Sequence, residues 1–300
     1  MKTPNNREAL SVAVQGKLAA LGTAGGGLFL IDLATASVLH ALQGHTIAVQ
    51  SVIFDGNEII SGSEDETVRV WDKISGRETL RIDAGAEVFG VAAHENLLVV
   101  GLYDYTVRVF DRASGGPCHV LTEATGQVYA VAIDAQRMVS GSFDKKVRVY
   151  AVPSFELLHV LEGHTVWVRS VALQGDRVVS GSLDNTVRLW DARSGDSLHV
   201  LQGHSKWVFS VSLLGSEIAS GSKDKSVRIW DAETGASMRV LDGTEAVRPI
   251  EEVLASPVEV NSENPVKEVL VSPAEVEAEL KPARTDEDLP AKLCPTCSIL

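Results

Sequence analysis

The sequence has few cysteines, no concentration of positive charge and no long apolar run. Three cysteines in 300 residues are too few for a disulfide framework, which indicates a reducing compartment such as the cytoplasm. A formal net charge of −13 argues against general nucleic-acid binding, because phosphate contacts need clustered lysine and arginine. No stretch approaches the roughly 18 apolar residues of a membrane-spanning helix, and the opening MKTPNNREAL has no apolar core of a signal peptide.

The end of the chain lacks aromatic residues altogether. All 5 tryptophans, 4 tyrosines and 7 phenylalanines precede residue 243, whereas most of the 10 prolines follow it. Frequent proline interrupts helices and β ladders, and the many glutamates favour disorder or an extended tether. The composition therefore predicts a folded domain over residues 1–242, a flexible acidic tail over 243–293 and a cysteine-containing segment over 294–300. In an alternative interpretation, part of the tail adds a strand to the domain.

A repeat of about 40 residues fills the chain before this tail. The stretch VVSGSLDNTVRLW at 178–190 recurs as IISGSEDETVRVW at 59–71, MVSGSFDKKVRVY at 138–150 and IASGSKDKSVRIW at 218–230. Each unit divides into four short runs of β-branched and aromatic residues, separated by turn-forming residues. Four such strands make a small sheet that cannot bury both faces alone, so stacked sheets are expected.

Several motif positions recur in register within these units. Gly-His pairs at 44–45, 163–164 and 203–204 precede Trp-Asp by about 26 residues, with Ser-Gly-Ser-x-Asp between them. This pattern resembles the WD-repeat β-propeller over roughly residues 7–242. The resemblance implies an all-β propeller, and the units at 7–42, 46–82, 85–121, 125–161, 165–201 and 205–242 predict six four-stranded blades. We expect a closed ring of six complete blades; the alternative is a seventh blade borrowed from the tail or a partner.

Histidine, serine, aspartate and tryptophan recur together in three units. The set looks like a hydrolase triad, but a hydrolase needs one such set beside a pocket, and this chain has three. The spacing suits a buried hydrogen-bond network, and the resemblance implies a blade-stabilising tetrad. The tetrad members are His45, Asp65 and Trp71; His164, Asp184 and Trp190; and His204, Asp224 and Trp230. We therefore expect no catalytic residue, no metal site, no cofactor and no small-molecule substrate.

The resemblance also implies a rim at one mouth of the propeller. It is formed by the residues beside the start of each first strand and by the residue directly before each turn aspartate. Seven aromatic residues and one arginine fall at these positions, which is the composition of protein-binding hot spots. The predicted partner-binding residues are Phe89, Tyr103, Tyr129, Phe143, Trp167, Arg169, Trp207 and Phe209. Trp167, Arg169, Trp207 and Phe209 rank first, because they are adjacent in neighbouring blades. In the alternative interpretation, several of these rings only pack between blades.

The last four residues, Cys297-Ser298-Ile299-Leu300, match a prenylation box, and the terminal leucine favours geranylgeranyl. One lipid seldom anchors a protein stably, and Cys294 is placed for palmitoylation as a second signal. Two alternatives stay open. The free C-terminus also resembles a PDZ ligand, and Cys294 and Cys297 form a CxxC pair that supplies only half of a metal or redox site.

Together these observations predict a non-enzymatic scaffold or adaptor that binds other proteins through the propeller face. It would be cytoplasmic and peripheral at a cytosol-facing membrane, held there by a lipidated C-terminus. The alternative function is a substrate receptor of a cullin-RING ubiquitin ligase. This alternative rests on Trp190-Asp191-Ala192-Arg193, which resembles the motif by which some propellers dock on the ligase adaptor.

Overall fold

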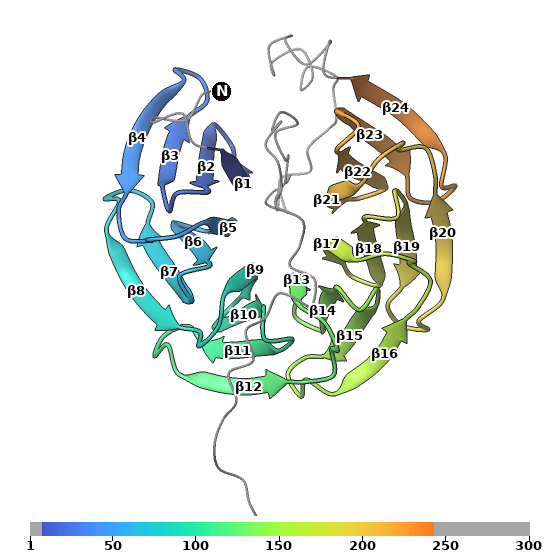
Figure 1. Ribbon diagram of the computed structural model, residues 1–300, viewed down its shortest axis with the longest axis horizontal. Coiled ribbons are helices and arrows are strands. Elements are labelled where there is room, and N and C mark those ends of the chain that lie inside the picture. Colours follow the sequence, from blue (N-terminus) through green and yellow to red (C-terminus); the bar gives the residue numbers. More distant parts are fainter. Residues whose placement is uncertain (1–7, 243–300) are drawn as a thin grey trace, which may run out of the picture.

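A computed structural model describes residues 8–242, which form six four-stranded antiparallel sheets arranged as blades around a centre (Figure 1). Residues 8–242 contain no helix, so the prediction of an all-β fold with six blades is confirmed. In every blade the strands follow one another in sequence order, and the first strand lies innermost (Figure 1). The tail and the cysteine-containing segment predicted from the sequence lie outside the described residues.

The strands of blades 1 to 3 are β1 (Ala9–Gln15), β2 (Leu18–Thr23), β3 (Leu28–Asp32) and β4 (Ser37–Leu42); β5 (Val49–Asp55), β6 (Glu58–Ser63), β7 (Thr67–Asp72) and β8 (Glu78–Asp83); and β9 (Val88–His94), β10 (Leu97–Leu102), β11 (Val107–Asp111) and β12 (Pro117–Leu121). Those of blades 4 to 6 are β13 (Val128–Ile133), β14 (Arg137–Ser142), β15 (Val147–Ala151) and β16 (Leu157–Leu161); β17 (Val168–Gln174), β18 (Arg177–Ser182), β19 (Val187–Asp191) and β20 (Ser197–Leu201); and β21 (Val208–Leu214), β22 (Glu217–Ser222), β23 (Ser226–Asp231) and β24 (Ser237–Asp242).

The hydrophobic core lies between the faces of neighbouring blades. In β19, Val187 and Leu189 pack towards blade 6, whereas Trp190, on the opposite face, packs towards blade 4. The alternation follows from the two-residue period of a strand, which points successive side chains to opposite faces of a sheet. The outermost strand β20 buries only Leu201 well and exposes its other residues to solvent or leaves them half-buried. Each blade is thus stabilised mainly by its neighbours rather than by its own sheet.

The aspartate of the Trp-Asp pair forms the turn into the outermost strand. The Asp191 Oδ1 accepts the backbone N–H groups of Arg193 at 2.7 Å and Ser194 at 2.9 Å. These bonds hold the pKa of Asp191 below its usual value, because they favour the carboxylate. Asp72, Asp111 and Asp231 accept the equivalent bond from the backbone N–H of the residue three positions on, which explains why this aspartate recurs with the period of the blades.

The six blades do not close into a ring, so that expectation is wrong for the described residues. Inner strands of successive blades pack together from β1 through β21, but no comparable contact joins β21 to β1. Figure 1 shows blades 1 and 6 at the two ends of an open arc. At the open end, Ala9 stands in β1 where β5 has Val49. Both residues lie opposite the last residue of the second strand in their blade. Val49 packs against Gly22 of the preceding blade, and the smaller Ala9 gives β1 no side chain of that size.

The face of blade 1 at the open end of the arc also differs from the equivalent face of the other blades, which packs against the preceding blade. Leu21, Phe29 and Ile31 occupy the positions of the serine, arginine and tryptophan of blade 2. These three apolar side chains pack on one another in a small cluster of their own. Blade 1 therefore ends the described arc without the polar network that other blades present at this face.

Candidate functional site

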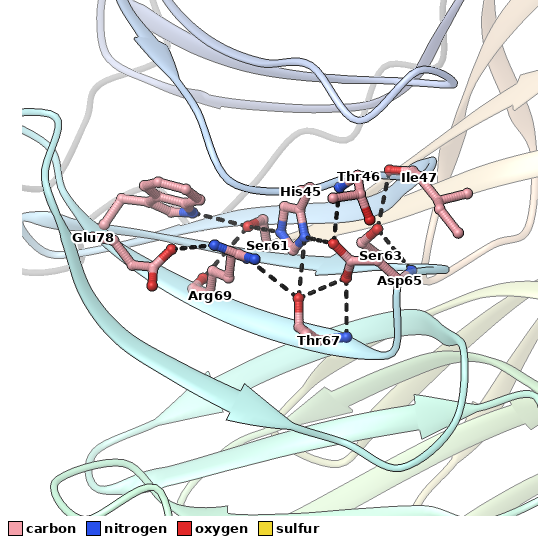
Figure 2. Close-up of polar contacts among 10 residues, drawn as sticks. His45, Thr46, Ile47, Ser61, Ser63, Asp65, Thr67, Arg69 and Glu78 are labelled. Carbon is pink, nitrogen blue, oxygen red and sulfur yellow. Dashed lines mark hydrogen bonds and ion pairs between the residues drawn. The ribbon is translucent and has the colours of Figure 1, made fainter.

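His45 stands at the centre of a buried hydrogen-bond network in blade 2, drawn in Figure 2. Its Nδ1 lies 2.9 Å from Asp65 Oδ2, and its Nε2 lies 2.8 Å from Ser61 Oγ. The Trp71 indole donates to the same Ser61 oxygen at 2.9 Å, and Thr67 Oγ1 donates to Asp65 Oδ1 at 2.6 Å. The carboxylate can only accept, so Nδ1 carries the proton and Ser61 donates to Nε2. The network links the loop before β5 to β6 and β7.

Burial fixes the charge state of this network. It lowers the pKa of His45 and of His204 below the ordinary value, because an imidazolium is poorly solvated there. Burial by itself would raise the pKa of Asp65. Hydrogen bonds from Thr67 and His45 outweigh that effect and leave its pKa lowered. The stable form is a neutral histidine that donates to a carboxylate.

The same network recurs in blades 5 and 6. His164 Nδ1 lies 2.8 Å from Asp184, and His204 Nδ1 lies 2.9 Å from Asp224. The serine bonded to both histidine and tryptophan is 0% exposed in blades 2 and 5 and 1% exposed in blade 6; these serines are Ser61, Ser180 and Ser220. A hydroxyl that is buried and bonded on two sides offers no nucleophile to a substrate. The structure thus brings all nine predicted tetrad residues together in three networks.

One member of each network was not predicted from the sequence. Thr67, Thr186 and Ser226 donate to the tetrad aspartate at 2.6 Å in all three blades. A hydroxyl residue two positions after the aspartate in each of these units is the sequence pattern that marks them.

Blade 4 lacks the histidine and satisfies its aspartate in another way. Arg148 Nη2 donates to Asp144 Oδ2 at 2.6 Å, and the two side chains are only 4% and 5% exposed. The arginine therefore supplies the positive partner where other blades place an imidazole N–H. Tyr150 replaces the tryptophan, and its hydroxyl donates to Glu123 at 3.2 Å. Blade 3 shows a more exposed form of the same pair, in which Arg108 donates to Asp104 at 2.7 Å.

The predicted rim residues lie at one mouth of the propeller because a backbone bond aligns them. In each of blades 2 to 6, the residue before the turn aspartate donates its N–H to the residue that precedes the inner strand. In blade 4 this bond joins Phe143 to Gln127 at 2.9 Å, and in blade 5 it joins Leu183 to Trp167 at 3.0 Å. The side chains of these positions thus cluster around the start of the inner strand.

Four aromatic rings from three blades form a continuous stack at this mouth. The centroids of Phe89 and Tyr129 are 4.4 Å apart, those of Tyr129 and Phe143 are 4.6 Å apart, and those of Phe143 and Trp167 are 3.7 Å apart. The rings of each pair lie within 23° of parallel. Tyr103 joins the end of the stack, with its centroid 6.0 Å from that of Phe89. We call Tyr103, Phe89, Tyr129, Phe143 and Trp167 the rim stack.

A cation lies against each of two aromatic side chains of the rim. The Arg169 guanidinium is 4.5 Å from the ring centroid of Tyr129. The Lys223 ammonium is 4.2 Å from the ring of Trp207, which also meets Phe209 edge-on at 6.2 Å. Burial lowers the pKa of Arg169, and no described acidic residue forms an ion pair with it. The rim thus combines aromatic area with a guanidinium that lacks an anionic partner in residues 8–242.

The rim residues separate into the rim stack with Arg169 and a second group in blade 6, made of Trp207, Phe209 and Lys223. Tyr103 is 44% exposed and Trp207 is 38% exposed, whereas Phe89 is 7% exposed and supports its neighbours from within. Trp167 and Trp207, which rank high from the sequence, belong to different groups. Tyr129 occupies the centre, since it touches two rings and the guanidinium.

The described residues hold no group of three or more histidine, cysteine, aspartate or glutamate side chains suited to a metal ion. They also contain no helix long and apolar enough to cross a membrane. Cys294 and Cys297 lie outside residues 8–242, so their predicted lipid modification is not tested by the structure.

Four segments of the chain match the family model "WD domain, G-beta repeat", at residues 36–72, 115–151, 155–191 and 195–231. Each segment begins at the outermost strand of one blade and ends with the third strand of the next, so the sequence repeat is offset from the blade by one strand. The inner strands of blades 1 and 3 lie outside these matches, and neither blade has the histidine and tryptophan of the tetrad. The chain thus contains four WD40 repeats within a six-bladed propeller.

Curated relatives match short stretches of the chain. "NACHT domain- and WD repeat-containing protein 1" of Mus musculus is 37% identical over 82 residues, which cover 26% of this chain and 5% of the mouse protein. "U3 small nucleolar RNA-associated protein 15" of Schizosaccharomyces pombe is 33% identical over 89 residues, covering 29% of this chain and 16% of the yeast protein. The chain therefore aligns with less than a fifth of either relative.

Among solved structures, the computationally designed Ika8 protein superimposes with a TM-score of 0.68 at 28% sequence identity. The alignment covers 77% of this chain and 73% of the designed chain. The likeness thus extends over most of the propeller rather than over one or two repeats.

Proposed function

We propose that this WD-repeat propeller is a protein-interaction scaffold whose partner binds at the rim stack and the neighbouring blade 6 group. The observation that carries the proposal is the stack of Phe89, Tyr129, Phe143 and Trp167, together with Arg169. Aromatic and arginine side chains dominate the binding energy of protein interfaces, especially where they are held rigidly. Stacking across three blades fixes these rings before a partner arrives, which reduces the entropy lost on binding.

The chemistry of the rim indicates what the partner presents. Half-buried Arg169 has no ion pair within residues 8–242, so an acidic group of a partner would be bound there with little competition from water. Exposed Tyr103 at the end of the rim stack and exposed Trp207 in the blade 6 group favour apolar or aromatic side chains in the same partner. We therefore expect a protein segment that combines an acidic residue with neighbouring apolar residues.

Affinity purification with quantitative mass spectrometry tests the proposal. The compared forms are the wild type, the rim variant Tyr129→Ala with Trp207→Ala, and the control Ile74→Ala. Ile74 is 73% exposed in the turn between β7 and β8, at the opposite end of the blades from the rim. We expect a set of proteins that is recovered with the wild type and the control but lost with the rim variant. Equal recovery by all three forms would contradict the rim as the binding surface.

A ubiquitin-ligase receptor is the second candidate function, and it rests on Arg193. This side chain is 74% exposed and donates to Asp176 at 2.5 Å, so it stands at the surface where an adaptor has access. Loss of a recovered ligase adaptor on Arg193→Ala, with the rim intact, would favour this role.

Attachment to a membrane through Cys297 remains a prediction from the sequence. Intact mass of the native protein tests it, with the mass of one geranylgeranyl group gained and Ser298-Ile299-Leu300 lost as the expected change. An unmodified C-terminus would contradict it and would leave the PDZ-ligand alternative open.

A further inference from the structure

Every interface between successive blades uses one pair of positions. A glycine in the second strand of a blade faces a valine at the start of the next inner strand. A Cβ on Gly141 would lie 2.7 Å from Val168 Cγ1, and a Cβ on Gly181 would lie 2.8 Å from Val208 Cγ1, both too close for a real contact. The valine thus fills the place that a side chain on the glycine would need. The five pairs are Gly22 with Val49, Gly62 with Val88, Gly101 with Val128, Gly141 with Val168, and Gly181 with Val208.

Gly221 holds this position in blade 6, but no described valine faces it. The nearest atom to its Cβ position is Ser210 Cβ, at 4.0 Å and in the same blade. Around it, Ala219, Val227 and Ile229 are only half-buried. The equivalent residues of blade 5 are 0% exposed because blade 6 covers them; they are Val179, Val187 and Leu189. Blade 6 therefore ends in an apolar face of the kind that receives an inner strand.

Blade 1 does not supply that strand. Its inner strand carries Ala9 at the valine position, and β1 makes no close contact with β21 (Figure 1). Within residues 8–242 of the same chain no strand covers this face, so an occupant would come from the rest of the chain or from another molecule.

The sequence after β24 repeats the spacing of an inner strand. Each interface valine follows the leucine or isoleucine near the end of the preceding outer strand by six or seven positions, as Val88 follows Ile82 by six. An apolar residue comes three positions after each valine. Leu241 is the corresponding residue of blade 6, and it is followed by Val247 after six positions and by Ile250 after three more. The 58 residues beyond Asp242 exceed one 40-residue repeat in length.

We propose that residues 243–253 of this chain bind the open face of blade 6, with Val247 against Gly221. The chain leaves β24 where each earlier outer strand leads into the next inner strand, so the segment is tethered beside its binding face. Tethering gives a millimolar effective concentration and favours this segment over a second copy of the chain. Pro249 is compatible with the position, because an innermost strand is an edge strand and tolerates a missing N–H.

A disulfide experiment tests the pairing directly in the full chain. Cys118, Cys294 and Cys297 are first replaced by serine, and Gly221→Cys with Val247→Cys is then introduced. Gly181→Cys with Val208→Cys is the positive control, since the Cβ position of Gly181 lies 3.6 Å from Val208 Cβ, close to the ideal spacing of about 3.8 Å in a disulfide. Gly221→Cys with Val266→Cys is the register control in the same tail.

We expect an intramolecular disulfide between positions 221 and 247 in a yield close to that of the positive control and at least about fivefold above the register control. A yield equal to the register control would overturn the proposal. A disulfide-linked dimer would also overturn it, because a second copy would then occupy the face.

A second measurement uses the native cysteines and avoids the risk that the double variant misfolds. Val247→Asp should lower the Tm of the full chain, because a carboxylate placed against Gly221 and Ile229 loses its hydration. Val266→Asp, with the same change of charge in the same tail, should leave the Tm unchanged. Equal Tm values for the two variants would contradict binding of residues 243–253 to blade 6.

Discussion

The ring of Phe143 lies flat against the indole of Trp167, with centroids 3.7 Å apart and planes 21° from parallel, although the two side chains belong to different blades. Phe143 follows the second strand of blade 4, and Trp167 precedes the inner strand of blade 5. The contact therefore joins two blades and at the same time shapes the surface at the mouth of the propeller. The rim stack therefore packs between blades, as the alternative interpretation of the sequence predicts, and Tyr103 at its end is exposed at the surface. Binding of a partner at these rings stays a prediction.

A double-mutant cycle should detect this coupling. Phe143→Ala and Trp167→Ala together should destabilise the protein by about 1 kcal/mol less than the sum of the single effects, because each single change already removes the stack. The free energy of unfolding in urea measures the cycle. Phe143→Ala with Trp207→Ala is the control and should be additive, since those two rings belong to separate groups.

Asp184→Ala should lower the stability by about 2–4 kcal/mol, because His164 and the N–H of Thr165 lose a buried acceptor. Asp104→Ala in blade 3 is the matched control; its carboxylate is 32% exposed and pairs with an arginine that water also reaches, so about 1 kcal/mol or less is expected. The Tm of each variant in thermal unfolding measures the two losses of stability. A Tm for Asp184→Ala equal to that of the control would contradict the stabilising role of the tetrad.

Arg148→Met should destabilise the protein strongly, by about 3–5 kcal/mol, because Asp144 would stay buried without its partner. Arg188 occupies the equivalent place in blade 5, but its guanidinium lies 5.7 Å from the Trp190 ring and His164 serves the aspartate. Arg188→Met should therefore cost much less. Denaturant midpoints of the two variants decide whether arginine has taken over the role of histidine in blade 4.

Stability should fall as the pH drops below about 6.5, the ordinary pKa of histidine. Burial lowers the pKa of His45 and His204 in the folded state, so below that pH the unfolded chain binds more protons and is favoured. Asp65 and Asp224 act in the same direction at more acid pH, since their folded pKa values are also lowered. The Tm followed from neutral to acid pH checks the trend. His204→Asn should flatten it, and an unchanged slope in that variant would contradict this assignment.

The blades and the tetrads could be predicted from the sequence because both depend on local spacing. A strand points alternate side chains to opposite faces, so a 40-residue period carries His164, Asp184 and Trp190 to the same relative places in every unit that has them. The ion pair of Arg148 with Asp144 in blade 4 could not be predicted from this spacing. An arginine side chain is long enough to reach several partners, and its choice depends on which of them is already satisfied.

Ring closure and the rim stack could not be predicted, because both depend on how the blades combine. Closure requires that blade 6 and blade 1 fit each other, and the alanine at position 9 matters only once Gly221 is known to lie at the open face. The position of Tyr129 at the start of its strand could be predicted. Its contacts with Phe89, Phe143 and Arg169 depend on the rotation between neighbouring sheets, which sequence spacing does not report.

The affinity of a purified partner for rim variants is the sharpest test of whether the rim binds other proteins. The dissociation constant of a protein recovered with the wild type would be measured for the wild type, for Tyr129→Ala and for the control Ile74→Ala. We expect Tyr129→Ala to weaken binding at least about tenfold, corresponding to a hot-spot loss of about 1.4 kcal/mol, while Ile74→Ala binds like the wild type. Equal affinity of all three forms would show that the partner binds elsewhere and would contradict the assignment of function to the rim.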